Sequence, residues 1–71
     1  MAYPNLIAEM ARNRINRHDI AKAVGRNVDT ITNWLNGRGD IPVGKALIIQ
    51  ATFFPDLAIR YLFSRKEDIS P

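Results

Sequence analysis

The sequence of 71 residues contains no cysteine, which excludes both a disulfide framework and a thiolate metal site. His18 is the only histidine, so neither a histidine metal site nor a Ser-His-Asp relay has the partners it needs. The carboxylates show no pairing with a nucleophile, and no glycine-rich phosphate loop follows a strand. The sequence therefore predicts no cofactor, no bound metal and no enzymatic activity.

Long hydrophobic runs are also lacking, and no stretch approaches the roughly 20 apolar residues that span a bilayer. The N-terminal segment has neither the basic start nor the apolar centre of an export signal. We therefore expect a cytoplasmic protein without a membrane partner. The longest apolar stretch, residues 46–54, is interrupted by Gln50 and Thr52 and is expected to form a buried core helix.

A chain of this length forms one domain, residues 1–71, near the lower limit at which apolar packing alone supports a fold. The spacing of apolar residues indicates five helices and no alternating strand, so the predicted class is all-α. Asn13 is expected to end the first helix in a left-handed conformation, and Asp56 to cap the fifth. Residues 64–71 have little to bury and are expected to fray. The expected helices cover residues 4–12, 17–23, 28–35, 43–53 or 43–54, and 57–63.

Positive charge is concentrated in the middle of the chain, whose formal net charge is +3. Residues 12–45 contain seven basic and three acidic side chains, a difference of +4, whereas residues 46–71 are balanced. A positive field confined to one stretch is the electrostatic signature of nucleic-acid binding. A solvated surface rich in lysine and arginine would show the same balance, so charge alone does not decide.

The segment from Arg17 to Gly37, RHDIAKAVGRNVDTITNWLNG, has the chemistry of two short helices joined by a tight turn. Gly25 can end the first helix in the left-handed conformation, because it has no Cβ to clash. Asn27 can cap the second helix, and Asp29 suits its positive first turn. Apolar residues occupy one face of each helix, including Trp34, which we assign to the core and not to base stacking. The polar face is then free to meet phosphates and base edges.

From about Leu6 to Phe63 the chain resembles the helix-turn-helix domains of the phage repressor and Cro type, the XRE-like regulators. The strongest part of the resemblance is the pattern I-A-x-x-V-G-x-x-x-x-T-I-x-x-W-L-N-G from Ile20 to Gly37. The ending FFPDLAIRYLF is similar to that of small phage-encoded members. The resemblance implies a lambda-repressor-like fold, a helix pair over residues 17–36, and insertion of the second helix into the major groove of double-stranded DNA.

Carried over by position, the resemblance also implies which residues read bases. Asn33 is the best candidate for a bidentate contact, because a carboxamide pairs with adenine N6 and N7. Val28 can touch a thymine methyl group, although the family often has an amide or arginine there. Asp29 is acidic and also departs from the common choices, so it either stabilises the first turn or accepts from cytosine N4. The base-reading candidates are Asn27, Val28, Asp29, Thr32 and Asn33.

A second set of residues is expected to hold the DNA backbone without reading sequence. Arg17 opens the first helix of the pair, where its guanidinium can take a phosphate bidentately. Each member of the set could equally be a solvated surface residue, so the argument depends on their clustering. The phosphate-contacting candidates are Asn16, Arg17, Arg26, Asn36, Arg38 and Lys45.

The resemblance implies a Cro-like phage or prophage repressor that acts by occupying an operator as a homodimer. Leu57, Tyr61 and Phe63 are the expected dimer seam, and a monomer with interior aromatics is the alternative. No residues remain for an effector module, so no small-molecule effector is expected. An antitoxin or antirepressor that uses the same fold to bind a partner protein is the alternative function.

Overall fold

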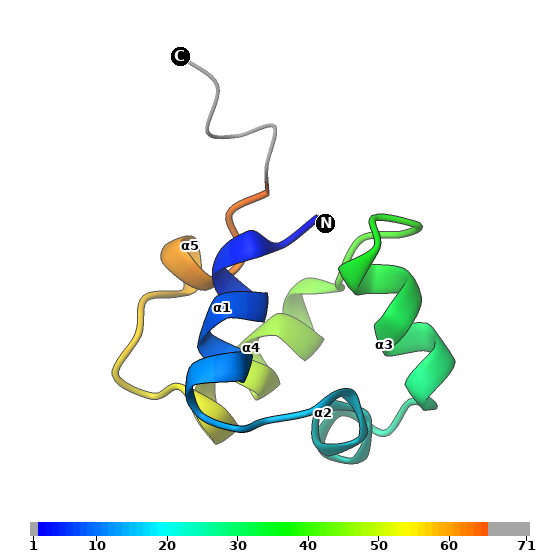
Figure 1. The fold of residues 1–71 in the computed structure, drawn as a ribbon, viewed down its shortest axis with the longest axis horizontal. Coiled ribbons are helices and arrows are strands. Elements are labelled where there is room, and N and C mark those ends of the chain that lie inside the picture. The colour runs from blue at the N-terminus through cyan, green and yellow to red at the C-terminus, as the bar shows by residue number, and fades with distance from the viewer. Residues whose placement is uncertain (1, 66–71) are drawn as a thin grey trace.

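The computed structural model describes residues 2–65, and within them the chain forms five helices and no strand (Figure 1). The predicted all-α class is confirmed. In Figure 1, α4 lies at the centre, α1 and α5 lie to its left, α3 to its right and α2 below. Within this part of the chain, no helix combines the length and apolar character required to cross a membrane. The helices are α1 (Pro4–Arg12), α2 (Arg17–Val24), α3 (Val28–Leu35), α4 (Val43–Phe53) and α5 (Ile59–Leu62).

Every helix contributes one fully buried side chain to a single core. Burial of one such aliphatic side chain stabilises a fold by about 1.5–3 kcal/mol relative to exposure. Trp34 is buried beside them, which confirms its assignment to the core. The fully buried residues are Leu6, Ile20, Ile31, Ile49 and Leu62, one from each helix in chain order.

The helices α2 and α3 end in the same way, with a left-handed glycine followed by an amide that donates to the carbonyl five residues before it. Gly25 has a φ of 70°, and the Arg26 amide donates to the Ala21 carbonyl at 3.1 Å. Gly37 has a φ of 83°, and the Arg38 amide donates to the carbonyl of Asn33 at 2.8 Å. Both ends are Schellman motifs, which turn the chain sharply and satisfy carbonyls that a helix end would leave open.

The end of α1 corrects one prediction. Asn13 has a φ of −104° and is not left-handed, whereas Arg14 has a φ of 57°. The Ile15 amide donates to the Met10 carbonyl at 2.8 Å, so Arg14 occupies the position that glycine takes in α2 and α3. The register is set by packing, because it places Ile15 against the core cluster that contains Met10. Asn13 is held in place by its side-chain amide, which donates to the Glu9 carbonyl at 2.8 Å.

We expect Arg14→Gly to stabilise the protein by about 0.5–1 kcal/mol. A left-handed residue with a Cβ costs about 1–2 kcal/mol, and glycine removes this cost. The greater flexibility of glycine in the unfolded chain offsets part of the gain in stability. The measurement is the free energy of unfolding in urea. Asn13→Gly is the matched control and should lower stability, because residue 13 gains nothing from a left-handed preference and loses its bond to Glu9. Equal effects of the two changes would contradict the argument.

The fifth helix is shorter than predicted. It covers only Ile59–Leu62, and its N-cap residue is Ala58, so the expected cap by Asp56 and the helical assignment of Leu57 are wrong. The Gln50 side-chain amide accounts for the difference, because it donates to the Leu57 carbonyl at 3.0 Å and lies 3.4 Å from two further carbonyls of this loop. Those carbonyls accept from the side chain of Gln50 on α4 and are therefore not used in the first turn of a helix.

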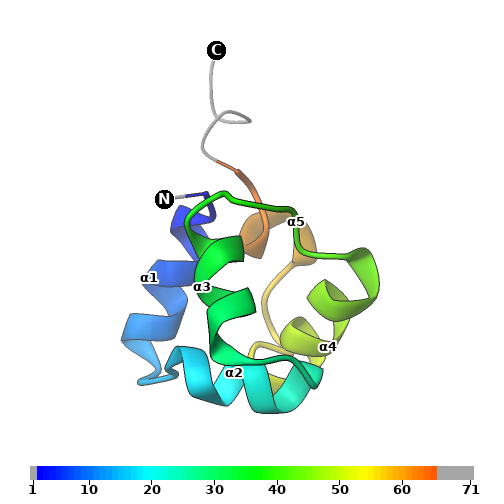
Figure 2. The same ribbon diagram turned by 90° about the vertical axis from the view of Figure 1, so that its right-hand side faces the viewer.

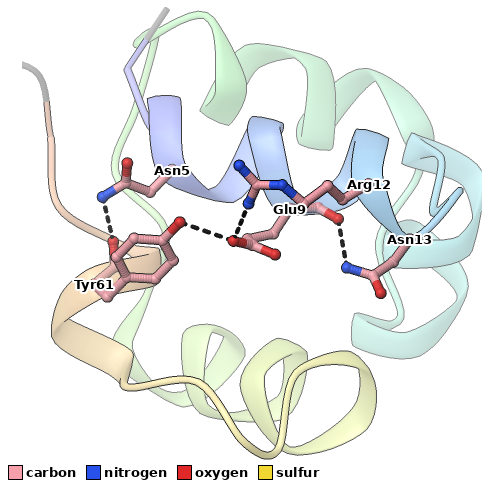
Figure 3. Close-up of polar contacts among 5 residues, drawn as sticks. All are labelled: Asn5, Glu9, Arg12, Asn13 and Tyr61. Atoms are coloured by element: carbon pink, nitrogen blue, oxygen red, sulfur yellow. Dashed lines mark hydrogen bonds and ion pairs between the residues drawn. The ribbon is translucent and has the colours of Figure 1, made fainter.

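A polar cluster joins α1 to α5 (Figure 3). The Tyr61 hydroxyl donates to the buried Glu9 carboxylate at 2.8 Å, and Arg12 forms an ion pair with the same oxygen. The Asn5 side-chain amide donates to the Tyr61 carbonyl at 2.8 Å. Hydrogen bonding with Tyr61, and then the charge of Glu9, raise the pKa of Arg12 above its ordinary value. The cluster therefore keeps a buried carboxylate paired and fixes α5 on α1.

The predicted fraying of residues 64–71 is wrong for Arg65. Its guanidinium donates to the Asp40 carboxylate at 2.7 Å and to the Tyr3 hydroxyl at 3.0 Å. It also lies over the Tyr3 ring, 5.1 Å from the ring centroid. The last described residue is thus held against the segment before α1 and against the loop between α3 and α4. The rest of the predicted frayed segment, residues 66–71, lies outside the described residues.

Candidate nucleic-acid interface

The outer face of α3 is uncovered and polar. Figure 2 shows α3 in front of the other helices, with no described element lying over it. The residues of α3 that point inward, Ile31, Trp34 and Leu35, are buried. On the outward side Asp29 and Asn33 are exposed, while Val28 and Thr32 are half-buried. Four of the five base-reading candidates therefore lie on this helix, and the fifth, Asn27, is its N-cap.

The two asparagine candidates are not equivalent. The Asn27 carboxamide oxygen accepts from the Thr30 amide at 2.9 Å and from the Thr30 hydroxyl at 3.1 Å. Only its NH₂ group is left for DNA, and a bidentate contact with adenine needs the oxygen as well. The exposed Asn33 side chain makes no hydrogen bond within residues 2–65, so both of its polar groups are available. The geometry thus favours Asn33 for base recognition and limits Asn27 to donation.

Asn16 fixes the start of α2. Its side-chain oxygen accepts from the Asp19 amide at 2.9 Å, and its own backbone amide donates to the Asp19 carboxylate at 3.0 Å. This capping box, with aspartate in place of the usual glutamate or glutamine, satisfies two backbone amides that a helix start leaves without acceptors. It also engages the Asp19 carboxylate in a hydrogen bond with a neighbouring backbone amide. Asn16 therefore has a structural role that the predicted phosphate contact did not include, and its NH₂ group remains exposed.

Arg17 connects the two helices of the pair. Its guanidinium donates to the Thr32 hydroxyl at 3.3 Å, which places a phosphate candidate on α2 directly beside a base-reading candidate on α3. The bond itself is exposed to solvent, so a DNA backbone could replace it without loss of a buried contact. The bond holds the cation at the edge of the α3 surface before any ligand arrives.

A groove of about 380 Å³ lies beside this bond, where the end of α1, the start of α2 and the end of α3 meet. Its rim contains Asn16, Arg17 and Asn36, so the fold brings three of the six phosphate candidates together. The groove is apolar beneath that rim, a feature that the sequence analysis missed. No local pattern reveals it, because its apolar lining comes from α1, from the turn after α1 and from the end of α3. These residues are Ile7, Met10, Ala11, Ile15 and Leu35.

The remaining cations lie in the turns before and after α3 and on α4. Arg26 lies in the turn before α3 and Arg38 follows Gly37 in the turn after it, so one basic residue flanks each end of the helix. Lys45 belongs to α4 and is half-buried. Among residues 2–65, the ion pairs are Arg12 with Glu9 and Arg65 with Asp40, and none involves these cations or Arg17. Their charges are therefore available to an anionic ligand.

Comparison of the chain with protein-family models, with curated proteins and with solved structures found no match. The functional interpretation therefore depends on the geometry of the α2–α3 pair and on the charges around it.

The predicted dimer seam is only partly on the surface. Leu57 and Phe63 are half-buried and pack against the core cluster. Tyr61 is exposed, although its hydroxyl is engaged by Glu9. These three residues therefore complete the monomer as well as bordering its surface.

The helix α4 corrects a further prediction. It was expected to be a buried core helix, but only Ala46 and Ile49 within it are buried. Val43, Leu47 and Ile48 are exposed. A signal was present in the sequence, because a helix that is apolar on all sides has a second apolar face that a small domain does not cover.

Proposed function

We propose that the protein is a sequence-specific double-stranded DNA-binding regulator with a lambda-repressor-like helix-turn-helix fold. One observation carries the proposal: the exposed outer face of α3, with the unengaged amide of Asn33 on it and a basic residue beyond each end. An α-helix with its side chains is about 10–12 Å across, which fits a major groove about 12 Å wide. The cations Arg26 and Arg38 would then lie near the backbones on the two sides of the groove.

The proposed activity is occupancy of an operator, as in a Cro-like repressor of a phage or prophage. Base edges are read from α3, while the side chains on the rim of the groove at the start of α2 hold the phosphates. The protein needs no catalytic group, cofactor or small-molecule effector to act in this way. It competes with transcription by binding alone.

The experiment that tests this function is selection of bound sequences from a pool of random DNA duplexes. We expect a short consensus with an adenine at a fixed position, because Asn33 is the residue best able to make a bidentate base contact. A chain that shows no preference for any duplex over bulk DNA, even in dilute buffer, would overturn the proposal. That result would favour the antitoxin or antirepressor alternative.

Two substitutions should separate base reading from backbone contact. We expect Asn33→Ala to cost about 1–3 kcal/mol on the selected site and to relax preference at one base pair. Arg17→Ala should weaken binding to all duplexes alike, because a phosphate contact carries no sequence information. Titration against the selected site and a scrambled site measures both effects. Arg60→Ala is the matched control for Arg17→Ala, because Arg60 is exposed on α5 and should not matter. Identical losses on both sites for Asn33→Ala would contradict its role.

A further inference from the structure

The outward face of α4 is the most apolar exposed surface among the described residues. Val43 is 76% exposed, Leu47 is 50% exposed and Ile48 is 38% exposed. A groove of about 330 Å³ continues this surface toward α5, lined in part by Ile59 and Phe63. Clustered exposed apolar side chains of this kind mark an interaction site in a small protein.

The exposed residues of α4 form a pattern that reads the same in both directions. They occur as three adjacent pairs, each four residues after the last, which forms two parallel rows along the helix. Their character is symmetric about the midpoint: a β-branched and a small residue at each end, and two large aliphatic residues in the centre. The six residues are Val43, Gly44, Leu47, Ile48, Ala51 and Thr52.

This symmetry suits an antiparallel pair of identical helices. Rotation about a two-fold axis that passes between Leu47 and Ile48 places Leu47 of one chain at the same level as Ile48 of the other. The same rotation sets Gly44 against Ala51, so that the small residues face each other and the helices can approach closely. Val43 and Thr52, both β-branched and of similar size, lie nine residues apart and therefore border the two opposite flanks of this face.

Two further observations favour a second copy over another ligand. None of the six residues carries a formal charge, so an identical face meets no like charge and offers nothing to an anionic or cationic partner. A Cβ added at Gly44 would meet no atom within 4 Å. Glycine is a poorer helix former than alanine, and no contact inside the monomer requires it at this position. Close approach of a second helix would explain a glycine at position 44, because glycine lets two backbones come near each other.

We propose that two copies of the chain pair through this face, with their α4 helices antiparallel about a two-fold axis between Leu47 and Ile48. The pairing differs from a seam centred on Leu57 and Tyr61, although Phe63 borders the same surface. Its consequence for DNA rests on the proposed function: the two-fold axis would present two α3 helices to one operator. The pairing itself stands on α4 alone.

The contact is small. Three helical turns on each side cover less than the roughly 1,600 Å² that a standard stable interface buries, so the free dimer is weak. Binding of two copies to adjacent half-sites would raise their effective concentration and complete the pair.

Cysteine cross-linking tests the register directly, because the natural chain has no cysteine. Chains with Gly44→Cys and chains with Ala51→Cys are mixed and oxidised. The mixture should form a heterodimer, because these positions face each other. Each variant alone should cross-link far less, because in its own dimer the two cysteines lie about 10 Å apart along the axis. Equal yields for the mixture and for the single variants would overturn the register.

Sedimentation equilibrium of the full chain tests the interface. We expect a concentration-dependent dimer whose association constant falls at least about tenfold in Leu47→Glu and in Ala51→Glu, since both bury like charges at the seam. Ala58→Glu is the matched control for Ala51→Glu, because Ala58 is also exposed but lies outside α4. Circular dichroism checks that every variant is folded. A monomer at all concentrations up to millimolar, or a dimer unaffected by both changes in α4, would overturn the proposal.

These outcomes are separate from those that test DNA binding. If the pairing is wrong and the function is right, the chain remains a monomer and selects an asymmetric single site. If the pairing is right and the function is wrong, the chain forms the α4 dimer and shows no duplex preference. A two-fold symmetric consensus whose two halves bind cooperatively, with cooperativity lost in Leu47→Glu, supports both.

Discussion

Replacement of Trp34 by alanine is expected to cost about 3–5 kcal/mol of folding stability. Trp34 is only 7% exposed and packs in the core cluster, so its removal leaves a large cavity in a domain with little other core. A chain of 71 residues has a total stability of roughly 4 to 11 kcal/mol. The variant should therefore be largely unfolded or melt far below the parent protein, as measured by circular dichroism.

The same substitution distinguishes a core anchor from a base-stacking residue. Trp34→Phe keeps most of the apolar volume and should retain the fold with a much smaller loss of stability. A residue that stacked on DNA would instead give a folded Trp34→Ala protein with impaired binding. An unchanged melting transition for Trp34→Ala would therefore contradict its assignment to the core.

DNA binding should weaken by about 150-fold for each chain when the salt concentration rises fourfold. Each cation that neutralises a phosphate contributes about −0.9 to the slope of log affinity against log salt. Four of the phosphate-contacting candidates are cations, namely Arg17, Arg26, Arg38 and Lys45, and no described carboxylate forms an ion pair with them. Their combined slope is about −3.6 per chain, because the neutral asparagines release no counterions.

Titrations of one duplex at several salt concentrations measure this slope. The double change Arg26→Ala and Arg38→Ala should reduce its magnitude by about 2, whereas Arg60→Ala on α5 should leave it unchanged. A flat response to salt would remove the electrostatic part of the proposed interface. It would leave the base-reading role of Asn33 to be judged on the selected sequences alone.

The helix pair was predictable because its chemistry is local. Asn16 and Asn27 cap the helices that follow them through hydrogen bonds to residues three positions ahead. Gly25 and Gly37 end helices because only a residue without Cβ adopts positive φ at little cost. Interactions of this range appear in the sequence as short, recognisable patterns.

The sequence predictions are wrong where contacts with distant residues determine the local conformation. Asn13 has the better intrinsic preference for a left-handed end, yet Arg14 takes that conformation because Ile15 must reach the core. The loop before α5 is held by Gln50, seven residues before Leu57, and this side-chain contact has no sequence signature. The backbone preference of one residue contributes about 1 kcal/mol to stability, and burial of an aliphatic side chain in the core contributes more.

The assembly of the candidate site divides in the same way. The sequence placed Val28, Asp29, Thr32 and Asn33 on one helix with its apolar side inward, and the fold keeps that arrangement. It did not predict that Arg17 would bond to Thr32, and it assigned Asn27 both to the cap and to base reading, although the cap uses the carboxamide oxygen. The bond between Arg17 and Thr32 depends on how α2 and α3 cross. The availability of Asn27 depends on whether its carboxamide oxygen caps the helix or stays free for a ligand.

The sequence by itself determined the number of helices, most of their ends and the polar face of α3, because these depend on contacts between residues a few positions apart. Only the tertiary structure decided which side of α4 is buried, how Glu9 is paired with Tyr61 and where Arg65 is held. The hydrogen bonds of Glu9 with Tyr61 and of Arg65 join residues between 25 and 62 positions apart, and many alternative partners satisfy the same local pattern. Packing of the whole chain selects among them, because only one arrangement buries the core and satisfies its polar groups together.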